Sequence, residues 1–217
     1  MISHKYKFIY IHVPKCGGTS VETSLYKYAE ASMGCGWARK NRAWRNKELF
    51  DILNSYRNYY IFTTVREPVS RCISIYNHFF REINCGAKLF IDSLEEFMKH
   101  EPWLLYKDVK HNKTTCDNVL IPELWKSAKL QHLIGYHVLP QDYFIPKNIS
   151  CDIYNLNDIS TLIEHISKKY SIVVENKPQR VCKHKLLTRD KLSQQLIDKI
   201  NDIYHMDHTI YNKCNKI

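Results

Sequence analysis

A short apolar run, Tyr6–Val13, stops at Pro14 and is followed by the pair Gly17-Gly18. A nearly continuous apolar run of this length is typical of a strand buried on both faces. The glycines predict a turn, and the pattern of Thr19–Glu30 then predicts a helix. This strand–loop–helix unit constrains the fold strongly, because it is the building block of α/β proteins.

A second unit of the same kind begins at Tyr59–Val65, which we expect to be a strand. A helix is predicted over Pro68–Arg81, and proline suits its first turn because the missing N–H costs little there. Further predicted elements are a helix at Ser93–His100 capped by Ser93 and Glu96, a strand near Asp152–Leu156, and helices at Asp158–Lys169 and Asp190–Tyr204. The alternation predicts an α/β fold in which helices flank a central parallel sheet. We expect residues 1–217 to form a single domain.

The chain carries a formal net charge of +10, with basic clusters at Arg39–Arg45 and Lys177–Lys185. Such a balance favours anionic partners, although a solvated basic surface would have the same composition. No apolar run approaches the roughly 20 residues of a membrane span. The N-terminus has no pattern of a signal peptide, so a complete chain is expected in the cytoplasm.

The eight cysteines do not form a ligand pattern. The closest pair is Cys72 and Cys85, and no CxxC or Cys/His pair with metal-ligand spacing occurs. We therefore expect free thiols rather than a zinc site or a disulfide framework. No metal ion is predicted.

The loop Pro14–Ser20 (PKCGGTS) combines a lysine, two glycines and two hydroxyls. Glycines allow backbone N–H groups to approach an anion closely, and the helix that follows directs the positive end of its dipole to the same place. Lys15 adds a full charge, and Thr19 and Ser20 can donate hydroxyl hydrogen bonds. The pattern predicts a phosphate-binding loop, and the simplest alternative is a tight turn with a surface lysine. It is not a Walker A loop, whose lysine follows the last glycine.

The segment Arg66–Tyr76 (REPVSRCISIY) carries the second group of candidates. Arg66 directly follows a predicted strand, where ligands of parallel sheets usually bind. Arg71, Ser74 and His78 are spaced so that they share one face of a helix. An arginine fork and a hydroxyl suit a second phosphate, and the alternative is that the arginines pair with neighbouring glutamates on the surface.

At these two segments the sequence resembles the sulfotransferases that use 3′-phosphoadenosine 5′-phosphosulfate, and it is most similar to the carbohydrate branch with uronyl 2-O- and chondroitin-type enzymes. In that family a loop like PKCGGTS holds the 5′-phosphosulfate, and a segment RxPxxRxxSxY holds the 3′-phosphate. Both occur here in the family's order and spacing. The similarity continues at His137–Gln141, Asp152–Leu156 and Ile203–Tyr211, and it is weakest over residues 85–130.

The resemblance implies a P-loop-like sulfotransferase fold and transfer of a sulfuryl group from this nucleotide, the donor substrate, to a hydroxyl or amine. It implies that Lys15 neutralises charge on the bridging oxygen of the donor, and that Arg66 and Ser74 bind the 3′-phosphate. The residues implied at the 5′-phosphate are Lys15, Cys16, Gly17, Gly18, Thr19 and Ser20. The expected acceptor is a glycan or another hydroxyl-bearing molecule, with no nucleic acid as partner. Enzymes of this family usually act in the Golgi lumen.

The general base stays open, because several relatives place a histidine shortly before the second strand and residues 31–65 contain none. His137 is the first candidate, since it begins an HVLPQ stretch that resembles an acceptor-side segment. His78, one turn beyond Ser74, is the second. Histidine suits the role because it accepts protons near neutral pH. His12 alternates with apolar strand residues, which predicts a core or supporting position.

Two other classes of function remain open from the residues alone. A nucleotide-dependent small-molecule kinase would need magnesium, and the missing Walker lysine counts against it. A non-catalytic basic module that binds glycans or nucleic acid would agree with the charge and the fifteen tyrosines. The sequence indicates neither the acceptor nor an oligomeric state.

Overall fold

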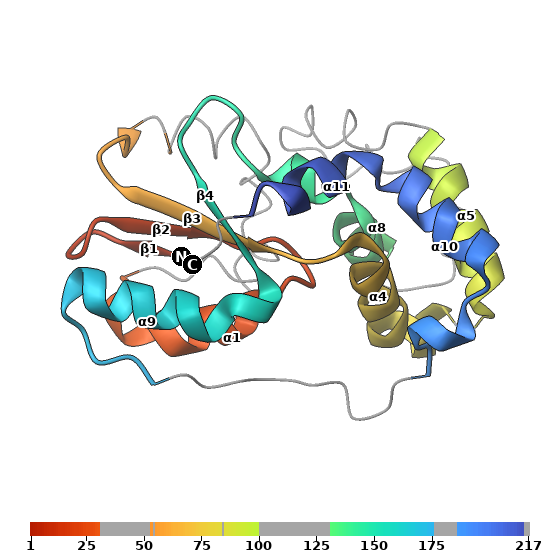
Figure 1. Ribbon diagram of the computed structural model, residues 1–217, viewed down its shortest axis with the longest axis horizontal. Helices are drawn as coiled ribbons and strands as arrows, with labels where there is room; N and C mark the ends of the chain where they lie inside the picture. The colour runs from red at the N-terminus through yellow and green to blue at the C-terminus, as the bar shows by residue number, and fades with distance from the viewer. Residues whose placement is uncertain (31–52, 54, 84, 100–130, 176–185, 215–217) are drawn as a thin grey trace. The chain divides into compact units, whose positions relative to one another are not determined.

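The computed structural model describes residues 1–30, 53, 55–83, 85–99, 131–175 and 186–214. The chain folds as two compact units, whose helices and strands are labelled in Figure 1. Unit 1 consists of Met1–Arg66, Phe144–Val181 and Thr209–Ile217, and unit 2 consists of Glu67–Tyr143 and Cys182–His208.

Unit 1 contains a four-stranded sheet in the order β1-β2-β3-β4. Its strands are β1 (Ile2–Ser3), β2 (Phe8–Ile11), β3 (Tyr60–Val65) and β4 (Asp152–Asn155). β2, β3 and β4 are parallel, and β1 pairs with β2 in the antiparallel direction. The predicted α/β class is confirmed, but the sheet is mixed, because the first residues of the chain add an antiparallel edge strand that was not predicted.

Both faces of this sheet are covered by apolar side chains. α1 (Gly18–Leu25) and α9 (Ile159–Tyr170) run along one face, where Figure 1 shows them side by side. Successive strand residues point to opposite faces, so Phe8, Tyr10 and Phe62 belong to the core under these helices. The other face has its own cluster, formed by Ile2, Ile9, Ile11, Leu53 and Ile61. A sheet buried in this way holds the carboxyl ends of its parallel strands in fixed positions.

Unit 2 is helical in the part that the structure describes. Its helices are α4 (Pro68–Ile83), α5 (Ala87–Lys99), α8 (Gln131–Val138) and α10 (Gln194–Ile203), and α11 (His205–Asn212) begins there. α10 packs against both α4 and α5. Short 3₁₀ turns complete the two units: η1 (Tyr26–Tyr28), η2 (Gln141–Phe144), η3 (Leu156–Asp158) and η4 (Arg189–Lys191).

Several predicted boundaries need correction. The first helix ends at Leu25 instead of Glu30, and the 3₁₀ turn η1 follows it. Ser93 is not a cap: it lies inside α5, where its hydroxyl donates to Leu89 O at 2.8 Å. A hydroxyl that bonds the carbonyl four residues back is a common alternative to capping. The basic cluster over residues 39–45 lies outside the described residues.

Candidate functional site

The predicted phosphate loop connects β2 to α1 within unit 1, and its backbone depends on glycine. Lys15 and Gly17 both have left-handed backbone, with φ of 65° and 80°. A Cβ on residue 17 would lie 2.4 Å from Leu156 Cδ1 and 2.6 Å from Ile159 Cδ1, closer than real contacts allow. A Cβ on residue 18 would lie 2.6 Å from the ring of His12. Gly17 therefore supplies both conformation and space, and Gly18 supplies space.

The loop ends in the N-terminus of α1. Gly17 is the N-cap residue, and its carbonyl accepts hydrogen bonds from the N–H groups of Ser20 and Val21 at 2.9 and 3.3 Å. The earlier N–H groups of a helix have no partner within the helix, and its dipole adds partial positive charge at this end. The first turn contains no acidic residue that would compete with an anion. Thr19 is exposed here and Ser20 is half-buried, so an anion could meet backbone and hydroxyl donors together.

Arg66 lies against the same loop. It directly follows β3, and its Nη1 donates to Lys15 O at 3.5 Å. Arg66 and Lys15 are both half-buried. The side chain of Cys16 is fully buried, with its thiol 3.5 Å from Pro14 O, and its backbone N–H donates to Val13 O at 3.4 Å. The structure thus brings two predicted cations to the carboxyl end of neighbouring parallel strands.

Two buried hydroxyls outside the predicted set support the loop, one directly and the other through the first. Thr64 Oγ1 donates to Cys16 O at 2.8 Å, and the hydroxyl of Tyr10 lies 2.6 Å from Thr64 Oγ1. The neighbouring Thr63 instead donates to Ile11 O of the adjacent strand β2 at 2.8 Å. A sequence signal for these contacts was present, since two threonines interrupt the apolar segment YIFTTV and buried hydroxyls need partners.

His12 packs beneath the loop. Its ring fills the space next to Gly18, and its Nδ1 lies 3.2 Å from Glu22 Oε2 in the second turn of α1. Both side chains are largely shielded from solvent. This is the supporting position that the strand pattern predicted for His12.

The two candidate bases lie together in unit 2. His78 is exposed on α4, and His137 is buried near the end of α8. Their ring centroids are 6.1 Å apart, and the rings are tilted by 26°. Phe79 packs against His137 edge-on, with a centroid distance of 5.1 Å. Ser74 is half-buried one turn before His78.

Arg71 does not lie on the surface beside Ser74, as the helical spacing suggested. It is 1% exposed, with Nη1 3.7 Å from Asp207 Oδ2. Its Nη2 donates to the carbonyls of His137 and Leu139 at 2.9 and 2.8 Å. The guanidinium group of Arg71 is thus engaged by partners inside unit 2. This argues against a direct role for Arg71 in phosphate binding.

The carboxylate of Asp207 receives further hydrogen bonds from the segment after α8. Gln141 N–H donates to Oδ1 at 2.7 Å, its side-chain amide donates to Oδ2 at 3.2 Å, and Asp142 N–H donates to Oδ1 at 3.2 Å. Tyr204 donates to Val138 O at 2.8 Å. This cluster fixes the backbone on which His137 is carried.

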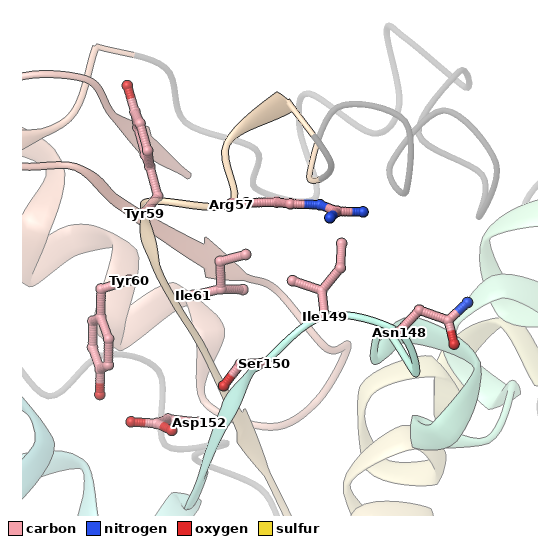
Figure 2. A pocket seen from close by; sticks show the side chains of 8 residues that line it. All are labelled: Arg57, Tyr59, Tyr60, Ile61, Asn148, Ile149, Ser150 and Asp152. Atoms are coloured by element: carbon pink, nitrogen blue, oxygen red, sulfur yellow. The ribbon is translucent and has the colours of Figure 1, made fainter.

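A cavity of about 310 Å³ lies in unit 1 at the amino ends of two of the parallel strands, opposite the end that carries the predicted loop. It is lined by residues near the beginning of β3 and β4, among them Arg57, Asn148, Ile149 and Asp152. Figure 2 shows Arg57 pointing toward Ile149 and Asn148, whereas Tyr59 and Tyr60 point in opposite directions. The predicted phosphate loop, in contrast, follows the carboxyl end of β2. No sequence pattern indicated this cavity.

In the described part of the chain, no group of three His, Cys, Asp or Glu side chains could hold a metal ion. None of its helices is long and apolar enough to cross a membrane. Its cysteines are free thiols: Cys16, Cys72, Cys85, Cys151 and Cys214.

Comparison with known proteins gives one match. A family model described as the sulfotransferase family matches residues 1–213. No curated protein and no solved structure matches the chain. The matched range contains the predicted phosphate loop, Arg66 and the helical segment with Ser74, so it includes both groups of candidate residues.

Proposed function

Because the chain belongs to the sulfotransferase family, we propose that it transfers a sulfuryl group from 3′-phosphoadenosine 5′-phosphosulfate to a hydroxyl or amine of a carbohydrate. One observation carries the donor part of this proposal. The N-terminus of α1, Lys15 and Arg66 bring positive charge to the carboxyl ends of β2 and β3. The glycines leave room there for an anion to approach the backbone closely.

Sulfuryl transfer resembles in-line phosphoryl transfer, so catalysis rests on positioning and charge stabilisation. In this proposal Lys15 neutralises the charge that develops on the bridging oxygen as the nucleotide leaves. Gly17 and Gly18 offer backbone N–H groups to the 5′-phosphate, and the hydroxyls of Thr19 and Ser20 add to them. The N–H of Cys16 donates to Val13 O at 3.4 Å, so Cys16 contributes by shaping the loop. Arg66 and Ser74 bind the 3′-phosphate.

The acceptor hydroxyl has to lose a proton as it attacks sulfur. In this proposal His137 is the general base that accepts this proton, and the adjacent His78 is the alternative base. The net charge of +10 favours an acidic glycan of the uronyl or chondroitin type as acceptor. Residues 1–217 act as one catalytic domain in this proposal.

Titration with nucleotides tests the donor assignment. We expect 3′-phosphoadenosine 5′-phosphate to raise the Tm of the protein, because a ligand that binds only the native state stabilises it. Magnesium–ATP should have a much smaller effect. Arg66→Ala should lose most of the shift, whereas Arg57→Ala, an exposed arginine at the other end of the sheet, should keep it.

The other functions predict different results. A preference for magnesium–ATP would indicate a kinase, and glycan binding without any nucleotide effect would indicate a binding module. An unchanged shift in Arg66→Ala would show that the 3′-phosphate site is assigned to the wrong residue. Sulfate transfer from labelled donor to a panel of glycans, peptides and small alcohols then identifies the acceptor.

A further inference from the structure

Resting on the proposed function, we infer that Thr64 is a positioning residue that orients the Cys16–Gly17 peptide group toward the 5′-phosphate of the donor. Thr64 is fully buried near the end of β3. Its hydroxyl donates to Cys16 O at 2.8 Å, so it acts on the loop backbone and not on the ligand. Thr64 is not among the residues that the sequence predicted to bind the donor.

The hydrogen bond sets the direction of a backbone donor. A trans peptide group is planar, and its C=O and N–H point in opposite directions. Because Thr64 holds the carbonyl of Cys16 toward β3, the N–H of Gly17 points away from β3. Gly17 is the N-cap of α1, so this N–H adds to the donors at the start of the helix.

The loop needs such a contact to keep its shape. Lys15 has a φ of 65°, a backbone conformation that residues with a side chain rarely adopt. Neighbouring φ and ψ values are therefore held by their surroundings and not by local preference. Thr64 makes one of these contacts, and Arg66 makes a longer one to Lys15 O.

Tyr10 fixes the hydroxyl of Thr64 in turn. A threonine hydroxyl has one proton, which Thr64 gives to Cys16 O. The 2.6 Å contact between the two hydroxyls then requires Tyr10 to donate to Thr64 Oγ1. Tyr10 is fully buried in β2, so the relay from Tyr10 to Thr64 to Cys16 O lies entirely behind the loop.

Thr63 is a matched control for Thr64. Both residues are fully buried in β3, and both donate to a carbonyl at 2.8 Å. The acceptor of Thr63 is Ile11 O in the neighbouring strand β2, whereas the acceptor of Thr64 lies in the loop. Replacement by valine removes each hydroxyl with little change of shape and leaves a carbonyl unsatisfied in both cases. Only Thr64→Val alters the orientation of the loop.

Calorimetric titration with two nucleotides separates positioning from stability. The probes are 3′-phosphoadenosine 5′-phosphate and adenosine 3′-phosphate, which lacks the 5′-phosphate. We expect Thr64→Val to bind the first about tenfold more weakly than wild type, the effect of one hydrogen bond, and the second equally well. Thr63→Val should bind both nucleotides as wild type does. Thr64→Ser keeps the hydroxyl and should restore the affinity.

Each other outcome has a definite meaning. Wild-type affinity of Thr64→Val for 3′-phosphoadenosine 5′-phosphate, or an equal loss for both nucleotides, would overturn the positioning role alone. A wild-type chain that binds neither nucleotide would overturn the proposed function. If Thr64→Val does not fold, Tyr10→Phe replaces it, and an affinity equal to wild type for 3′-phosphoadenosine 5′-phosphate in that variant would overturn the inference.

Discussion

Lys15 carries a full charge, and its left-handed backbone sets the direction in which its side chain leaves the loop. If it acts on the leaving oxygen, Lys15→Ala should lower kcat by about 100-fold or more while weakening donor binding much less. Lys15→Arg should restore little of the lost kcat, because the planar guanidinium group does not replace the point charge of an ammonium group at one oxygen. Comparing kcat with the Kd of 3′-phosphoadenosine 5′-phosphate measures this difference.

Lys27→Ala, which changes an exposed lysine of unit 1, is the control and should behave as wild type. Equal losses in kcat and in binding for Lys15→Ala would make Lys15 a simple anchor for the 5′-phosphate.

His137 and His78 can be distinguished by single replacements. We expect His137→Ala to abolish transfer to the acceptor and to leave the Kd of 3′-phosphoadenosine 5′-phosphate unchanged, because a general base touches the acceptor and not the donor. Removing a ring that packs on Phe79 also costs stability, so the Tm has to be recorded for each variant.

His205→Ala alters an exposed histidine of the same unit and should keep full activity. If His78→Ala loses transfer while His137→Ala retains it, the two roles are exchanged.

The conformation of the candidate loop was predictable where the sequence itself expresses the constraint. Gly17 and Gly18 are such residues, since a tight turn favours glycine and the structure shows which atoms a side chain would meet. That the loop binds phosphate stays a prediction. Arg71 was misplaced, because helical spacing says which residues share a face but not which face is buried. Its partner Asp207 lies far along the chain, and no local pattern indicates it. Thr64 was missed because the sequence of an apolar strand does not indicate which carbonyl a buried hydroxyl in it will bond.

At the scale of the elements, α5 and α10 are joined by Lys199. Its Nζ lies 2.7 Å from Asp92 Oδ1 and 2.8 Å from Glu95 Oε2. We expect Lys199→Ala to lower the free energy of unfolding by about 1 kcal/mol at neutral pH, the upper range for partly exposed ion pairs. Urea unfolding measures this difference, with Lys168→Ala on α9 as an exposed control that should change nothing.

The difference should depend on pH. Hydrogen bonds from Lys199 and Lys88 hold the pKa of Asp92 below its ordinary value, and one from Lys199 lowers the pKa of Glu95. A carboxyl group whose pKa is lowered by folding stabilises the protein above its ordinary pKa, about 4. That contribution is lost as the pH falls through the lower, folded value. The gap between wild type and Lys199→Ala should therefore begin to narrow below about pH 4, and a gap that stays constant as the pH falls further would contradict the ionic origin.

Elements with strong local signals were predicted well. α4 begins at Pro68 as expected, and β3 begins within one residue of its prediction. β1 has only two residues, too few for any periodicity. α5 begins earlier than expected because Ser93, read as a cap, is a buried residue inside the helix. The sequence therefore indicates which elements exist better than where they end.

At the scale of the whole molecule, unit 1 is assembled from three separate segments of the chain and unit 2 from two. The three parallel strands come from two of these segments, so the sheet cannot be completed by any one of them. Composition and charge carry no trace of this interleaving, which is why the sequence alone predicts no internal boundary. The assignment of residues 1–217 to one catalytic domain stays a prediction.

The supports of the phosphate loop have a consequence for the order of folding. Thr64 is 48 residues beyond Cys16, and the side chains that border Gly17 belong to Leu156 and Ile159. Contacts between distant residues form late, since the intervening chain has to close first. During synthesis the loop is made before these partners, which lie later in the chain. A nascent chain that ends before η3 and α9 already contains Thr64 but lacks Leu156 and Ile159, so we expect it to bind nucleotide more weakly than a chain that contains these elements.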